Sequence, residues 1–130
     1  MARSMGFRWL NKAEENLKLA KLALEHGFYA LSCFHSQQAA ELAFKALLIG
    51  LAGIHLITHS LTRLASEAKN LVNLNLPEED KLRRLEDHYV QARYPNARVS
   101  SYTLREAEEA YKTAEVVFNE CSRAFREAEV

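Results

Sequence analysis

The residues best suited to chemistry lie in one short segment, 93–98, between two stretches of helical pattern. Arg93 opens the segment and Arg98 closes it, and arginine presents a planar fork of N–H donors that matches the oxygens of a phosphate. The ring of Pro95 disfavours helical geometry at Tyr94, so this turn is stiffer than a glycine loop. We therefore predict an anion-binding turn in which Arg93 and Arg98 hold phosphate and Tyr94 stacks on the ligand or shapes its site.

The surroundings of this turn are cationic in a chain without net charge. Lys plus Arg and Asp plus Glu each number 17, so any anion site must come from local clustering. Between residues 83 and 105, five arginines stand against only two acids, Glu86 and Asp87. The same composition also fits a solvated loop whose arginines pair with surface glutamates. Three interleaved tyrosines offer faces that can stack bases: Tyr89, Tyr94 and Tyr102.

Polar residues at helical spacing interrupt an otherwise apolar segment near residue 40. Gln38, Glu41 and Lys45 share one helix face, which is either hydrogen-bonded inside a bundle or lines a groove. His55 and His59 stand four apart, as two metal ligands on one helix would, but they fall in an expected loop without an H-E-x-x-H arrangement. We predict no metal and no cofactor, and we expect His59 to face a cleft beside Lys45.

Apolar residues at three- and four-residue steps predict the elements that position these groups. Alternating strand patterns and internal repeats are absent from the sequence, so we predict an all-α, up-and-down helical bundle of about five helices, forming one domain over residues 1–130. The expected helices span residues 7–26, 29–51, 59–69, 77–91 and 103–127.

Start and stop signals set the expected bounds of these helices. In chain order they are Gly27 after the first helix, Gly50 and Gly53 loosening the end of the second, Thr58 as an N-cap, Pro77 as a first helical residue, and Thr103 with Glu106 as a capping box.

The composition indicates a globular protein of the cytoplasm. Hydrophobic residues make up 48% and charged residues 26% of the chain, which argues against disorder. The start of the chain lacks the apolar core of a signal peptide, and no apolar run is long enough to span a membrane. Cys33 and Cys121 lie in apolar helical patterns, so we expect two buried free thiols.

Several segments taken together resemble the HEPN domain family. Residues 27–48 resemble the signature helix of that family, and His59-Ser60-Leu61 resembles the opening of its third helix. Tyr89 followed by residues 93–96 (Arg-Tyr-Pro-Asn) resembles the approach to its last helix. The order and spacing cover the chain from about Phe7 to Phe125.

The resemblance implies a homodimer encoded beside a minimal nucleotidyltransferase, which binds nucleotide or RNA or serves as one half of a toxin–antitoxin pair. Many members are metal-independent ribonucleases whose motif is an arginine, four to six residues and a histidine, paired across the dimer cleft. At the three positions after Arg93 where this motif would place its histidine, the sequence has Arg98, Val99 and Ser100. An imidazole exchanges protons near neutral pH and a guanidinium does not, so the usual acid–base group is missing here.

Our leading hypothesis is a non-catalytic module that binds nucleotide or RNA phosphate and partners a minimal nucleotidyltransferase. One alternative is a metal-independent ribonuclease. The other arginine with a histidine at that spacing is Arg83 with His88, but these lie about 140° apart on a helix, so Arg84 shares the face of His88 instead. Another alternative is a purely structural interaction dimer. The predicted phosphate-binding residues are Lys45, His59, Arg93, Tyr94 and Arg98.

Overall fold

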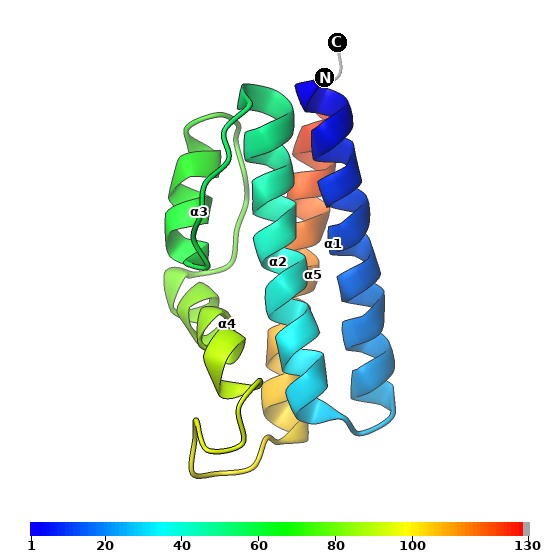
Figure 1. Cartoon of the computed structure of the whole chain (residues 1–130), viewed down its shortest axis with the longest axis vertical. Helices are drawn as coiled ribbons and strands as arrows, with labels where there is room; N and C mark the ends of the chain where they lie inside the picture. Colours follow the sequence, from blue (N-terminus) through cyan, green and yellow to red (C-terminus); the bar gives the residue numbers. More distant parts are fainter. Residues whose placement is uncertain (129–130) are drawn as a thin grey trace.

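The computed structural model describes residues 1–128, and over that range it consists of five α-helices joined by turns and loops. The helices are α1 (Ala2–Glu25), α2 (Tyr29–Ala52), α3 (Leu61–Lys69), α4 (Glu79–Gln91) and α5 (Leu104–Glu127). Figure 1 shows α1, α2 and α5 as three long helices running along one another, with the shorter α3 and α4 one beyond the other beside α2. The predicted all-α class with about five helices is confirmed.

Helix α2 is central because it is apolar over most of its circumference. It packs against each of the other four helices. Its fully buried side chains include Phe44, Leu47 and Leu48, which meet Phe125 of α5 and Leu64 of α3 in one core. Burying a side chain of this size contributes roughly 1.5–3 kcal/mol, so this core is the main source of stability. Within residues 1–128 no helix is long and apolar enough to cross a membrane.

The start of α1 packs closely against the end of α2. A Cβ on Gly6 would lie 2.5 Å from the Cα of Gly50, so the two backbones approach more closely than side chains would permit. The guanidinium of Arg3 donates to the carbonyl of Phe125 at 2.9 Å and covers its ring. Two predictions were therefore wrong: α1 begins at Ala2 rather than Phe7, and Gly50 packs inside α2 instead of loosening it. Tertiary contacts stabilise this first part of α1 although Gly6 has a weak helix propensity.

Helix ends confirm some of the predicted signals. Gly27 and Gly53 adopt positive φ angles of 79° and 66° just past α1 and α2, as expected of glycines that end helices. Thr103 and Glu106 form the predicted capping box at the start of α5. The second helix extends one residue beyond its predicted end, to Ala52.

The predicted starts of α3 and α4 were wrong. Ser60, not Thr58, is the N-cap of α3, and Glu86 of α4 accepts a hydrogen bond from the Leu61 backbone N–H at 2.7 Å. The Ser60 hydroxyl accepts from the Arg63 backbone N–H at 3.3 Å, so a local cap and a distant carboxylate together fix the start of α3. Pro77 lies before Glu78, the N-cap of α4, rather than at the first helical position.

Both cysteines are buried and free, as predicted. Burial raises the pKa of the Cys33 thiol to about 12 and raises that of Cys121 further, so neither thiol ionises near neutral pH.

Candidate functional site

A buried carboxylate on α2 organises the first part of the site. Glu41 is only 4% exposed. Its Oε1 accepts hydrogen bonds from Gln37 Nε2 and from His59 Nδ1, each at 2.9 Å, and its Oε2 accepts one from Lys45 Nζ at 3.0 Å. Gln38 extends this hydrogen-bond network by donating to Gln37 Oε1 at 2.7 Å. A buried charge is tolerated only with such partners. Of the two alternatives for the polar stripe, hydrogen bonding inside the bundle is correct.

His59 connects this carboxylate to the surface. Its Nδ1 is the donor, because an ionised carboxylate can only accept, and this leaves Nε2 as an acceptor in the neutral ring. The ring stacks on Tyr89 of α4 with 3.8 Å between centroids and 19° between planes. The side chain is 52% exposed. An imidazole oriented by a buried carboxylate and open to solvent is able to exchange protons with a ligand.

Arg93 supplies a positive charge beside the same tyrosine. Its guanidinium carbon lies 4.8 Å from the ring centre of Tyr89, 5.4 Å from that of Tyr94 and 5.8 Å from that of Phe34 on α2. No ion pair joins Arg93 to an acid among residues 1–128. Aromatic faces attract a cation without neutralising it, so Arg93 is oriented and still available to an anion.

These contacts bring together residues from two helices, α2 and α4, and from the segments before α3 and after α4, and we call them the Glu41–Arg93 site. Its members are Phe34, Glu41 and Lys45 of α2, His59 just before α3, Tyr89 in the last turn of α4, and Arg93 just after α4. Of the predicted phosphate-binding residues, the structure thus joins Lys45, His59, Arg93 and, through its ring contact with Arg93, Tyr94.

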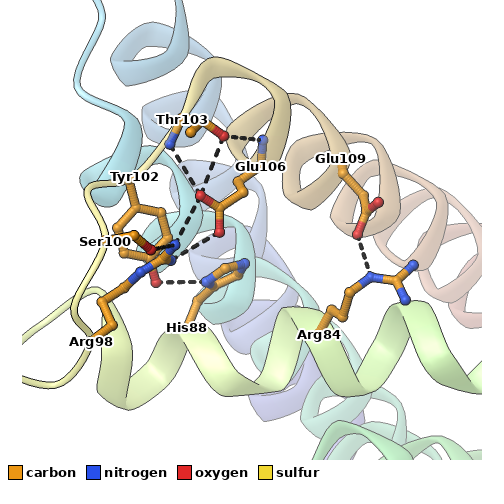
Figure 2. Close-up of polar contacts among 8 residues, drawn as sticks. All are labelled: Arg84, His88, Arg98, Ser100, Tyr102, Thr103, Glu106 and Glu109. Carbon is orange, nitrogen blue, oxygen red and sulfur yellow. Dashed lines mark hydrogen bonds and ion pairs between the residues drawn. The ribbon is translucent and has the colours of Figure 1, made fainter.

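Arg98 has a different environment from Arg93. It makes a two-armed ion pair with Glu106 at 2.9 and 3.0 Å, donates to Ser100 at 3.1 Å and lies 4.0 Å from the ring centre of Tyr102 (Figure 2). Burial would raise the pKa of Glu106, but the bonds from Arg98 and Thr103 hold it below its usual value. For Arg98, the alternative prediction that the arginines of this loop pair with glutamates is therefore correct.

The residues considered for a ribonuclease do not meet on one surface. His88 is 7% exposed, its Nδ1 lies 2.7 Å from the Tyr102 hydroxyl, and burial lowers its pKa to about 4. Arg83 is exposed and bonded to Glu79, while Arg84 is paired with Glu109 at 2.6 Å (Figure 2). His88 thus joins α4 to the segment that precedes α5.

Some members of the site could not be found from the sequence. Glu41 stands out in the sequence as part of a polar stripe, whereas Phe34 carries no signal beyond ordinary helix composition. The spacing of Gln37, Glu41 and Lys45 by four residues was the available clue to the network. His55, the other half of the histidine pair, is exposed in the connection 53–60, and within the described part of the chain no cluster of three or more His, Cys, Asp or Glu could hold a metal.

Comparison with known proteins identifies relatives that extend over nearly the whole chain. The model of the HEPN domain family matches residues 7–124. A protein of Methanocaldococcus jannaschii named "Putative toxin MJ1304" is 36% identical, with 84% of this chain and 80% of that protein covered. The crystal structure of TT1696 from Thermus thermophilus has a TM-score of 0.80 and 32% identity, covering 95% of this chain and 99% of that one. An archaeal HEPN homologue, ST0689, has a TM-score of 0.70 and 32% identity, covering 96% and 99%.

The buried, neutral His88 predicts a specific pH dependence of stability. Its pKa is about 4 in the folded chain against an ordinary value of 6.5, so between these values the unfolded chain binds more protons and folding weakens as the pH falls. The full effect is about 3 kcal/mol. Urea unfolding at pH 7, 5.5 and 4.5 should show wild type losing up to that much more stability than His88→Gln. Equal losses in both proteins would contradict this assignment, since all other titrating groups are shared.

Proposed function

Because this chain belongs to the HEPN domain family and is related to the protein named "Putative toxin MJ1304", we propose that it binds nucleotide or RNA phosphate at the Glu41–Arg93 site. The observation that carries this proposal is the unpaired guanidinium of Arg93, held over three aromatic rings. A phosphate would accept its N–H donors, and a base would stack on Phe34 or Tyr94.

Lys45 and His59 would act as secondary contacts. Lys45 is 13% exposed and bonded to Glu41, so its charge is already partly balanced. His59 can donate to phosphate through Nε2 when protonated. We leave Arg98 out of the contact set, because Glu106 occupies both arms of its guanidinium.

We further propose that the protein is a homodimer of the cytoplasm that serves as one half of a toxin–antitoxin pair with a minimal nucleotidyltransferase. The support for the dimer is an apolar groove of about 320 Å³ at the α1–α2 turn, which includes the exposed Leu22, Phe28 and Leu31. His35 lines the same groove and touches Phe34 edge-on, with centroids 5.5 Å apart. A second copy seated there would border the Glu41–Arg93 site.

A second candidate function is metal-independent RNA cleavage, and the hydrogen bond between Glu41 and His59 favours it. In that reaction the 2′-hydroxyl oxygen attacks phosphorus while His59 Nε2 takes its proton. The bond to the 5′ oxygen breaks, and that oxygen takes up a proton from water. Glu41 would orient the imidazole and stabilise its protonated form, as a carboxylate does in other histidine-based sites.

Replacing Arg93 tests the binding proposal. Arg93→Gln should weaken binding of ATP or a short labelled RNA at least about tenfold, because it removes a charge-assisted hydrogen bond. Fluorescence anisotropy at fixed salt measures the RNA affinity, and calorimetry measures that of ATP. Arg63→Gln, which removes an exposed charge from α3, is the matched control. Equal affinity in all three proteins would refute the proposal.

Replacing His59 tests the enzymatic alternative. Should wild type cleave RNA in the presence of a chelator, His59→Ala should slow cleavage by about 10²- to 10⁴-fold, whereas His88→Gln should leave it unchanged. Glu41→Gln should reduce the rate and alter its pH profile, after circular dichroism confirms folding. A wild-type protein that binds RNA without cleaving it would reject this alternative and leave the binding proposal intact.

Charge placed in the apolar groove tests the dimer. Leu31→Glu should convert a dimer to monomers, because burying an unpaired carboxylate opposes association. Sedimentation at micromolar concentration distinguishes the two states. Val99→Glu makes the same kind of change at an exposed position outside the groove and should have no effect. Wild-type monomers at this concentration would rule out a dimer.

A further inference from the structure

A second groove lies between α4 and α5, apart from the Glu41–Arg93 site. It has a volume of about 550 Å³, and the segment before α4 forms part of its wall. Lys81 enters from α4, while Arg105 and Lys112 enter from α5. The latter two are seven residues apart, which places them two turns apart on one face of α5. The groove thus collects cations from two separate helices.

The charges in this groove leave it positive. Within residues 1–128, Lys81, Arg105 and Lys112 make no ion pair. Of the two lining acids, Glu109 is already paired with Arg84 across the two helices, as Figure 2 shows, and Glu108 remains. Three unpaired cations against one unpaired carboxylate give a local charge of two positive units.

The inner wall of the groove holds an unused hydrogen-bonding group. Thr113 is only 4% exposed, and its hydroxyl has no hydrogen-bond partner among the described residues. Among residues 1–128, Ser36 Oγ is the only side-chain polar atom that is buried from solvent and has no hydrogen-bond partner. The Thr113 hydroxyl also has no partner, so it is not buried from solvent and is open to the groove that Thr113 lines. Leu76 and the 42%-exposed Val116 add apolar surface to the lining.

We propose that this groove binds the phosphate monoester of a small organic molecule. A phosphate monoester carries close to two negative charges at neutral pH, which the local charge balances. Its oxygens would accept hydrogen bonds from Lys81, Lys112 and Thr113, with Arg105 adding charge. The organic part would pack on Val116 and the neighbouring apolar wall. The volume is that of a small-molecule site. This proposal does not depend on the proposed function.

Calorimetry on this chain tests the groove with three probes: phenyl phosphate, AMP and inorganic phosphate. Arg105→Gln combined with Lys112→Gln should weaken phenyl phosphate binding at least about tenfold, since two charge-assisted contacts are removed. Thr113→Val, which keeps the shape of the side chain, should weaken it about three- to tenfold. Lys21→Gln, at an exposed position on α1, should leave it unchanged. Tighter binding of phenyl phosphate than of inorganic phosphate would support the apolar contact.

The outcomes separate the possibilities. Preference for AMP that is lost in the groove variants identifies a nucleotide as the source of the phosphate, and equal binding of phenyl phosphate identifies a simpler ester. Loss of binding in Arg93→Gln with unchanged binding in the groove variants would overturn the proposal and assign the ligand to the Glu41–Arg93 site. Absence of binding by all three probes at millimolar concentration would also overturn it.

Discussion

The burial of one carboxylate, Glu41, is the constraint on which the site depends. A charge at this depth requires donors, and the chain supplies them from the same helix through Gln37 and Lys45 and from a distant connection through His59. The last bond holds the residue before α3 against α2. It thereby places the imidazole of His59 where the ring of Tyr89 stacks on it, and the same ring contacts the guanidinium of Arg93. Without the buried charge, His59 would lose its hydrogen bond to α2.

Arg93 and Arg98 lie in the same turn but have opposite environments: a carboxylate pairs with Arg98, and aromatic rings surround Arg93. Glu106 accepts from the Thr103 backbone in the capping box and from Arg98, so one carboxylate starts α5 and anchors the loop before it. Arg98 is therefore a structural residue that stabilises the loop carrying Arg93. Aromatic rings orient Arg93 and leave its charge unbalanced. One arginine fixes the loop, and the other remains available to an anion.

Helix α4 borders both the Glu41–Arg93 site and the groove against α5. Tyr89 near its end faces the Glu41–Arg93 site, whereas Lys81 near its start lines the groove against α5. His88, between them, is buried and neutral, which explains why a histidine at a suggestive spacing from Arg83 belongs to the core. The exposed imidazole comes instead from the connection before α3, outside the arginine–histidine spacing that many members of the family use.

The sequence alone determined the helical class, the capping box of α5 and the turns at Gly27 and Gly53, because these depend on interactions within a few residues. It also identified the residue types of the site, including Arg93, His59 and Lys45. Tertiary structure decided which of them are free. The Glu41–His59 bond spans 18 residues and the bond from the Leu61 backbone to Glu86 spans 25. Whether an arginine meets a carboxylate or an aromatic ring depends on which helices pack together, and spacing along the chain does not encode that.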